Sequence, residues 1–462
     1  MDYDVLVLGG GLIGCAIAYE LSKYNLNIAL IEKDYDIADD VSLVNTSMVF
    51  DGLQSNDSLT SKLEIMGSNM MEEIASKFNV PFKRYPSLTF CKDEERIKKL
   101  YNDALKRDVK GIEIVNEHRI KELEPNVPIK YTKAIYSKNT GIICPYDLAL
   151  GYGEVAFDNN VNFKLEEEVV DIKKEPKGFK VITNKNKFTC KIVINTTPNR
   201  GFSIDGETKE EEKEENLNIK YFTINKEVDI DYSNLIFNIS GKNEAIISIP
   251  TLTGETIGAV VTEENIDNST VFDKVGSLMP KVDLNFITTF NEDKYHAKPF
   301  VIDDSSIDIG YIKVTSKHYA LVTMAPAISK IVCETVVSNI NCIKRKNFID
   351  KRREYYKFRN LDKDEINEII KLDSRYGNII CSCEKVTEGE IIEAIRRPLG
   401  ARTLEGVKRR TGAAFGKCQG AQCLNKILAI LARETNKSLI DIVKDSKNSN
   451  ILLNRIKEFE SM

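Results

Sequence analysis

The chain has 462 residues, and 65 Lys and Arg against 70 Asp and Glu give it a formal net charge of −5. This length is sufficient for two or three domains with buried cores, and a weakly acidic chain has no overall positive field to attract nucleic acid. No apolar run reaches the length of about 18 residues that a membrane span needs, and the N-terminus lacks a secretory leader pattern. We therefore expect a cytoplasmic protein without a membrane span and leave peripheral membrane association open.

The N-terminal segment has the pattern strand, glycine turn, helix, strand. An apolar run at residues 5–8 leads into the motif G-x-G-x-x-G, formed by Gly9, Gly11 and Gly14, and a second apolar run ends at Glu32. In such a unit the first glycine permits a tight turn, the second lets a pyrophosphate approach the backbone, and the third lets the helix pack closely. An acidic residue at the second strand end favours an unphosphorylated ribose, hence FAD or NAD. The alternative is a glycine turn that has lost its ligand.

The middle of the chain alternates between helical and extended patterns. Residues 62–79 and 94–108 read as amphipathic helices, and residues 160–196 return to strands. Residues 219–262 alternate apolar and polar side chains with glycine punctuation, which indicates antiparallel strands. Residues 312–337 read as a strand, a loop and a long helix.

Four cysteines near the C-terminus carry a metal-site pattern. Cys381 and Cys383 form C-x-C, and after 34 residues Cys418 and Cys423 form C-x4-C. Four converging thiolates can hold a metal ion or an iron–sulfur cluster. A structural zinc site is an alternative, although zinc sites usually pair ligands across two to four residues, and unrelated buried thiols are another. The six other cysteines lie scattered in apolar contexts, which is typical of reduced thiols rather than a disulfide framework.

These motifs together resemble a known family. The chain resembles the glycine oxidase/D-amino-acid oxidase superfamily of FAD-dependent oxidoreductases, and within it the anaerobic-type bacterial glycerol-3-phosphate dehydrogenases. The resemblance is close over residues 1–35, 59–88 and 139–150, very close over 376–434, and poor between about 198 and 320. Residues 376–434 resemble the small helical domain of bacterioferritin-associated ferredoxin, which binds a [2Fe–2S] cluster.

The resemblance implies an α/β fold with three parts: a Rossmann-like FAD-binding domain, an inserted α+β substrate domain with an antiparallel sheet, and a small helical [2Fe–2S] domain. The expected division is a discontinuous FAD-binding domain (residues 1–80, 139–200 and 310–343), a substrate or cap domain (81–138 and 201–309), a helical linker (344–376), the [2Fe–2S] domain (377–434) and a helical tail (435–462).

The resemblance also implies the residues that contact each cofactor. Those expected to bind FAD are Gly9, Gly11, Leu12, Ile13, Gly14, Glu32, Lys33, Ser42, Asn45, Val169, Thr197 and Thr323. The expected cluster ligands are Cys381, Cys383, Cys418 and Cys423.

Several residues depart from the family pattern around the expected substrate. Phe50 stands where a histidine is expected, and both Pro198 and Leu321 stand where glycines are expected. The substrate-binding arginine of the second domain is missing, and the same stretch offers only Lys294, His296 and Lys298. His318 is a weak candidate for a replacement acid or base, against the plainer interpretation of a surface or half-buried histidine.

Three interpretations therefore stay open. The first is a flavin dehydrogenase, similar to glycerol-3-phosphate dehydrogenase, that oxidises a small hydroxy or amino substrate by hydride transfer to FAD and passes electrons to the cluster and then to a protein acceptor or partner subunit. The second is an electron-transfer or structural subunit with a degenerate substrate site. The third is a non-enzymatic relative in which the cluster serves as a sensor or scaffold, because a shared fold does not establish a shared site.

Overall fold

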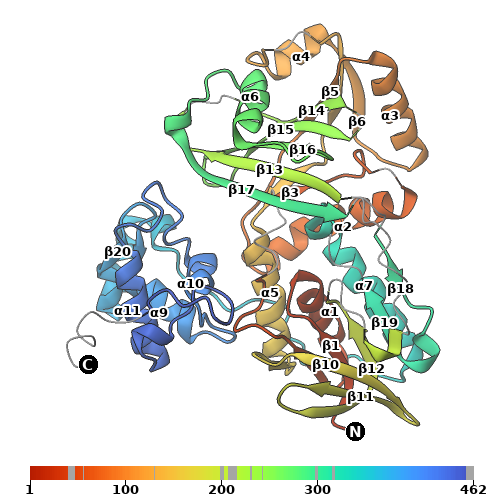
Figure 1. Ribbon diagram of the computed structural model, residues 1–462, viewed down its shortest axis with the longest axis vertical. Coiled ribbons are helices and arrows are strands. Elements are labelled where there is room, and N and C mark those ends of the chain that lie inside the picture. Colours follow the sequence, from red (N-terminus) through yellow and green to blue (C-terminus); the bar gives the residue numbers. More distant parts are fainter. Residues whose placement is uncertain are drawn as a thin grey trace.

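Figure 1 shows three regions in the computed structural model: a sheet with helices that contains the N-terminus, a second sheet at the top of the view, and a small helical region near the C-terminus. The structure describes residues 1–39, 47–55, 57–128, 131–197, 202–205, 216–228, 232–241, 243–296, 300–314 and 318–453.

The first sheet is built around the N-terminal strand. Its strands are β1 (Tyr3–Leu8), β2 (Ile28–Ile31), β9 (Asn162–Lys164), β10 (Val169–Glu175), β11 (Gly178–Thr183), β12 (Lys187–Asn195), β18 (Ile302–Asp303) and β19 (Tyr311–Val314). The order is β10-β11-β12-β1-β2-β9, with β19 beside β12 and β18 beside β19. The pairs β1–β2, β1–β12, β2–β9 and β12–β19 are parallel. Residues 5–8 are fully buried, as expected for a parallel strand covered on both faces.

Four helices pack with this sheet: α1 (Leu12–Ser22), α2 (Ser58–Lys77), α5 (Pro145–Asp158) and α7 (Leu321–Asn339). Side chains of all four join the sheet in one apolar cluster. Among the described residues, α7 is the one helix long and apolar enough to cross a membrane, with 19 residues and a mean hydropathy of 1.4. Because 67% of it is buried inside the protein, its apolar character is explained by its place in the core.

The second sheet is mostly antiparallel. Its strands are β5 (Ser87–Cys91), β6 (Ile112–Asn116), β7 (Lys133–Ser137), β13 (Asn216–Ile224), β14 (Leu235–Gly241), β15 (Glu244–Pro250), β16 (Thr256–Thr262) and β17 (Ile287–His296). They follow the order β17-β13-β16-β15-β14-β5-β7-β6, in which β14 and β5 form a parallel pair. Helix α6 (Asn268–Leu278) covers one face. The other face, which includes Phe237, Ile247 and Ala259, packs toward the first sheet and its helices.

Smaller elements connect these two sheets. A three-stranded sheet is formed by β3 (Met48–Val49), β8 (Gly141–Ile143) and β4 (Phe82–Arg84), and helices α3 (Glu94–Lys106) and α4 (Glu117–Leu123) lie near β6 and β7. Both α3 and α4 begin with an Asp or Asn cap, Asp93 or Asn116, whose side chain accepts backbone N–H groups.

The C-terminal region has its own core. Its elements are the hairpin β20 (Ile379–Cys381) and β21 (Val386–Thr387) and the helices α9 (Glu388–Arg396), α10 (Leu404–Thr411) and α11 (Leu424–Thr435). A separate apolar cluster joins them. Thr387 and Glu390 form the capping box that starts α9.

The predicted α/β class, with an antiparallel sheet region and a small helical C-terminal region, is confirmed by this architecture. Two predicted helical segments differ from the structure. Within residues 344–376, only α8 (Lys363–Leu372) is an α-helix, and the rest is extended chain with short 3-10 turns. After α11, Asn436 adopts a left-handed conformation that ends the helix, and residues 437–453 form a 3-10 turn and an isolated bridge. Residues 454–462 lie outside the described residues.

Candidate functional site

The glycine turn lies between β1 and the N-terminus of α1. Gly9 has φ +102°, and a Cβ on Gly14 would lie 2.0 Å from the carbonyl oxygen of Gly9, so only glycine fits this close contact. Gly11 is the N-cap of α1 and provides no side-chain cap. The N–H groups of the first helical turn, at Leu12 and Ile13, therefore have no side-chain cap from Gly11. They form the kind of cradle that suits a pyrophosphate.

Glu32 lies directly across this turn. One carboxylate oxygen accepts the backbone N–H of Gly10 at 2.5 Å, and the other accepts that of Asp34 at 2.9 Å. The half-buried carboxylate thus lies at the end of β2, next to the glycines. This is the position that a ribose-binding acid occupies. The predicted neighbour Lys33 instead faces solvent and pairs with Asp34.

Thr196, the residue that follows β12, completes the turn. Thr196 donates its hydroxyl to the carbonyl of Leu8 at 2.7 Å and lies against Gly9 and Gly14. The predicted Thr197 instead donates both its N–H and its hydroxyl to Asn195. The role of Thr196 follows from the parallel pairing of β1 with β12, which places the two strand ends side by side. The predicted Val169 is buried at the start of β10, in the apolar cluster that contains Leu8 and Ile31.

A second group of predicted residues gathers at the N-terminus of α7. Thr323 is fully buried, and its hydroxyl oxygen accepts the backbone N–H of Phe50 at 3.0 Å. Gly67 of α2 packs so closely that a Cβ there would lie 1.8 Å from the carbonyl oxygen of Thr323. Leu321, which begins α7, is buried. The predicted Ser42 and Asn45, and Pro198, lie outside the described residues.

Phe50 places an aromatic ring where a base is expected. Its ring meets that of Tyr319 edge-on, with centroids 5.1 Å apart, and also approaches Phe237 of the second sheet. His318 is buried, and its Nδ1 accepts the N–H of Ala320 at 3.2 Å. A neutral histidine with that bond carries its proton on Nε2 and has no free lone pair for a substrate, which weakens His318 as a candidate base.

The strands β13 to β17 present no lysine or arginine on the face that packs toward the first sheet, as far as their described residues show. Lys294, one of the three predicted positive groups, is exposed on β17, whereas its neighbour Tyr295 is buried. His296 ends β17, and Lys298 lies outside the described residues. The described part of this face therefore offers apolar and aromatic side chains with few polar groups.

The four C-terminal cysteines lie in two turns and form two pairs. Cys381 ends β20, and Cys423 caps α11. The thiols of Cys381 and Cys423 lie close enough to influence each other's protonation, and so do those of Cys383 and Cys418. The backbone N–H groups of Gln422, Gly420 and Ala421 lower the pKa of Cys418, because N–H donors favour a thiolate.

This arrangement fits a two-iron cluster better than a single ion. Among the described residues, no three His, Cys, Asp or Glu side chains converge on one metal position. Two thiol pairs match a [2Fe–2S] cluster, in which each iron takes two protein ligands. A Cβ on Gly416 would lie 2.4 Å from that of Cys383, so the turn that carries Cys418 can approach only because glycine stands there. None of the ten cysteines forms a disulfide in the structure.

Buried ion pairs join the C-terminal region to the first sheet. Arg410 of α10 binds Asp36 through two bonds of 2.6 Å, and Arg409 binds Asp39 at 2.8 Å. Both aspartates follow Glu32 closely in the chain. The side chains of Arg409, Arg410 and Asp36 are at most 3% exposed.

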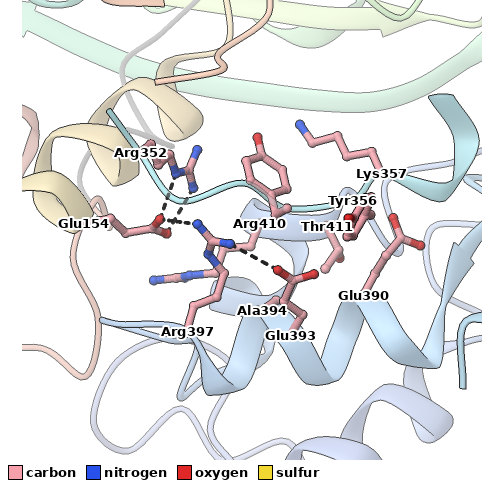
Figure 2. A pocket seen from close by; sticks show the side chains of 11 residues that line it. Glu154, Arg352, Tyr356, Lys357, Glu390, Glu393, Ala394, Arg397, Arg410 and Thr411 are labelled. Atoms are coloured by element: carbon pink, nitrogen blue, oxygen red, sulfur yellow. Dashed lines mark hydrogen bonds and ion pairs between the residues drawn. The ribbon is translucent and has the colours of Figure 1, made fainter. Parts of the chain in front are cut away.

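A second group of ion pairs lines a small pocket at the same junction. Figure 2 shows Glu154 of α5 between the guanidinium groups of Arg352 and Arg397, each 2.8 Å away. Burial alone would raise the pKa of Glu154, but the two guanidinium groups lower it to about 2. We call Glu154, Arg352 and Arg397 the clamp. It was missed at the sequence level because its members are far apart in the chain and follow no motif.

Comparison with known proteins identifies both ends of the chain. Residues 4–221 match the family model described as FAD dependent oxidoreductase, and residues 379–433 match the BFD-like [2Fe-2S] binding domain. The chain is 35% identical over 471 aligned positions to a glycerol 3-phosphate dehydrogenase of Caloramator mitchellensis, covering 97% of this chain and 98% of that protein. This chain is an FAD-dependent oxidoreductase of that family.

Other relatives agree with this assignment. A glycerol 3-phosphate oxidase of Mycoplasma pneumoniae is 27% identical over 193 residues, which is 40% of this chain and 50% of that protein. In fold, the chain is similar to a dithionite-reduced L-α-glycerophosphate oxidase from Mycoplasma pneumoniae with FAD bound, with a TM-score of 0.67 at 22% identity over 77% of this chain and 99% of that one. A glycine oxidase from Geobacillus kaustophilus gives a TM-score of 0.60 at 17% identity, again covering 77% of this chain and 99% of the other.

Family membership confirms FAD and a [2Fe–2S] cluster as the predicted cofactors of this oxidoreductase. The zinc and unrelated-thiol alternatives for the four cysteines, and the non-enzymatic interpretation, are therefore set aside. The individual cofactor-binding residues remain predictions. Those best supported by the geometry are the three glycines of the turn, Glu32 and the four paired cysteines.

Proposed function

We propose that this flavoprotein oxidises the secondary alcohol of glycerol 3-phosphate and passes the electrons to its own [2Fe–2S] cluster, from which a protein acceptor takes them. The observation that carries the proposal is the similarity, over nearly the full length of both chains, to the glycerol 3-phosphate dehydrogenase of Caloramator mitchellensis. The same order of FAD and [2Fe–2S] regions within one chain supports it. We expect the protein to work in the cytoplasm.

The bound cofactors would supply the redox chemistry: FAD accepts a hydride from an alcohol carbon, and the cluster accepts electrons singly. The residues of the chain would hold and orient these groups. The glycine turn and α1 would bind the pyrophosphate, Glu32 would bind the ribose, and Thr323 would fix the backbone of Phe50 beside the substrate. The four thiolates would hold the cluster, with the N–H groups around Cys418 stabilising its negative charge.

The docking of the cluster region supports an intramolecular electron path. Arg409 and Arg410 bind the segment that leads from the ribose-binding end of β2 toward residues 40–46. Lys417, next to Cys418, reaches Glu227 after β13 of the second sheet at 3.3 Å. Helix α10 is thus bound to the first sheet region, and the turn that carries Cys418 makes an exposed contact with the second.

The test is anaerobic reduction of the purified protein by glycerol 3-phosphate. Bleaching of the flavin absorption by glycerol 3-phosphate, but not by glycerol, would support the proposal. If cofactor-replete protein is not reduced by glycerol 3-phosphate at any concentration, this substrate is wrong.

A second candidate function is an electron-carrying subunit with a degenerate substrate site. Phe50 in the position of the expected base favours it, as does the lack of cations on the described inner face of β13 to β17. In that case the flavin would be reduced only when a partner chain is present, and co-purification of a second dehydrogenase would identify that partner.

A further inference from the structure

A buried carboxylic acid lies immediately behind Phe50. Glu64 of α2 is fully buried, and its Oε1 accepts the hydroxyl of Tyr319 at 2.9 Å. Its other oxygen, Oε2, is buried without a hydrogen-bond partner in the described residues. Burying a carboxyl group with an unsatisfied oxygen is costly, and α2 could bury an apolar side chain at this position at no such cost. The cost therefore points to a use for the acid.

Tyr319 connects this acid to Phe50, the residue that stands where a base is expected. It lies in the turn just before α7, its ring meets Phe50 edge-on, and its hydroxyl also lies 3.4 Å from Ser55. Tyr319 keeps part of its surface accessible, whereas Glu64 has none. The tyrosine thus stands between the buried acid and Phe50.

The other ionisable groups nearby are already engaged. The carboxylate of Asp51 accepts the hydroxyl of Ser137 and the N–H of Leu53. His318, stacked on Tyr319, has its Nδ1 occupied by a backbone N–H. Two further carboxylates influence the pair electrostatically: Asp51 raises the pKa of Glu64, and Asp57 raises that of Tyr319. Both are negative, so they add no positive charge that would force Glu64 to ionise.

We propose that Tyr319 and Glu64 together replace the missing base at position 50 and accept the proton of the substrate hydroxyl. This inference rests on the proposed function. Bound FAD would supply the oxidant, taking the hydride with both electrons of the substrate C–H bond while a C=O bond forms. The substrate O–H bond breaks toward the Tyr319 oxygen, while the Tyr319 proton passes to the Glu64 carboxylate. The proton returns to solvent through Tyr319 when the product leaves. Tyr319 is then the catalytic residue, and Glu64 is the proton store that acts through it.

The protonation behaviour of the pair agrees with this role. Burial raises the pKa of Glu64 to about 8, and the nearby hydroxyls of Ser55 and Tyr319 offset only part of this increase. Burial next to Glu64 raises the pKa of Tyr319. A carboxyl group with a pKa near the working pH can both take up and release a proton. The ionised form accepts the proton, so oxidation should accelerate as pH rises through about 8.

One test needs no substrate. In the holoenzyme, a pH titration of the flavin visible absorption should show a transition with its midpoint near 8, because the proposal places the ionising Glu64 near the flavin. Glu64→Gln should lose the transition. The matched control is Glu124→Gln, which alters a buried acid of the second sheet region that is bonded to Asn234, and it should keep the transition. Absence of the transition in the wild type, or its survival in Glu64→Gln, would overturn the proposal.

The second test is anaerobic stopped-flow reduction of the flavin by glycerol 3-phosphate. Tyr319→Phe and Glu64→Gln should each slow reduction by about 10²-fold or more, with substrate affinity little changed, and Glu64→Gln should lose the pH dependence. Tyr152→Phe, which removes another buried hydroxyl, should reduce normally. Rapid reduction in both site variants would overturn the proton-accepting role of Tyr319 and Glu64 and leave the proposed function standing. If the wild type is not reduced, the proposed function fails, and the role of the pair as proton acceptor fails with it.

Discussion

A single methyl group decides whether the dinucleotide turn can form. A Cβ on Gly14 would lie 2.0 Å from the carbonyl oxygen of Gly9, and backbone cannot yield by that distance without moving β1 from α1. We expect Gly14→Ala to lower the free energy of unfolding by about 2 kcal/mol or more and to reduce flavin occupancy. Thermal unfolding and the ratio of flavin to protein would measure both effects.

The matched control is Gly276→Ala in α6, where a Cβ would meet nothing within 4 Å. Replacing a helical glycine by alanine in open space should raise stability by about 0.5–1 kcal/mol. Equal losses in the two variants would contradict the steric account of Gly14.

The burial of Glu64 also has a consequence for stability. Its pKa is about 8 in the folded protein against 4.5 for the free side chain, so between these values the unfolded chain ionises while the folded chain holds its proton. The folded state then binds more protons, and stability falls as pH rises from about 4.5 to 8. Glu64→Gln should remove this loss and raise stability at pH 7 by an amount on the order of 3 kcal/mol. If chemical denaturation at pH 5 and pH 8 gives the same wild-type-to-variant difference, Glu64 does not stay protonated.

At the scale of elements, the clamp joins α5 to α9 through the chain before α8. The pKa of Glu154 is lowered to about 2, so its contribution is fully present above the unfolded value of about 4.5 and is lost as pH falls toward 2. Glu154→Gln should destabilise the protein at pH 7 by about 3–5 kcal/mol. Arg352 and Arg397 lose the buried carboxylate that both bind, and keep only Asp147 at 3.6 Å and Glu393 at 3.2 Å. The difference between variant and wild type should shrink as the pH of calorimetry is lowered from 5 to 3.

An exposed pair from the same junction serves as the control. Arg353 binds Asp158 at 2.6 Å, but its side chain is 57% exposed. Arg353→Ala should cost less than about 1 kcal/mol. A comparable loss in both variants would mean that burial does not determine the strength of the clamp.

The sequence predicted the elements that local patterns encode. The glycine turn follows from its motif. Apolar spacing predicted helices at 62–79 and 94–108 and strands over 160–196, and the structure has helices at 58–77 and 94–106 and strands within 162–195. Local spacing does not encode which distant residues meet, so the clamp, the Glu64–Tyr319 pair and the role of Thr196 in the turn were not predictable. The described part of the predicted helical tail at 435–462 contains no α-helix after Asn436, whose left-handed conformation ends α11.

At the scale of the whole molecule, the two cofactor regions are expected to bind independently. Cys381→Ser and Cys418→Ser should each lose iron and labile sulfide while keeping FAD, because each removes one member of a thiol pair, whereas the glycine turn lies in the first sheet region. Cys342→Ser, outside the four, should keep both cofactors. Iron retained at the wild-type level in both ligand variants would refute the ligand assignment.

The central claim is that electrons from glycerol 3-phosphate reach the cluster through the flavin of the same chain. The most direct measurement is electron paramagnetic resonance of the anaerobic protein, frozen after glycerol 3-phosphate is added. We predict a reduced-cluster signal in the wild type, and a bleached flavin without that signal in Cys381→Ser. A wild-type flavin that is reduced while the cluster stays oxidised, or a flavin that is not reduced at all, would contradict the account.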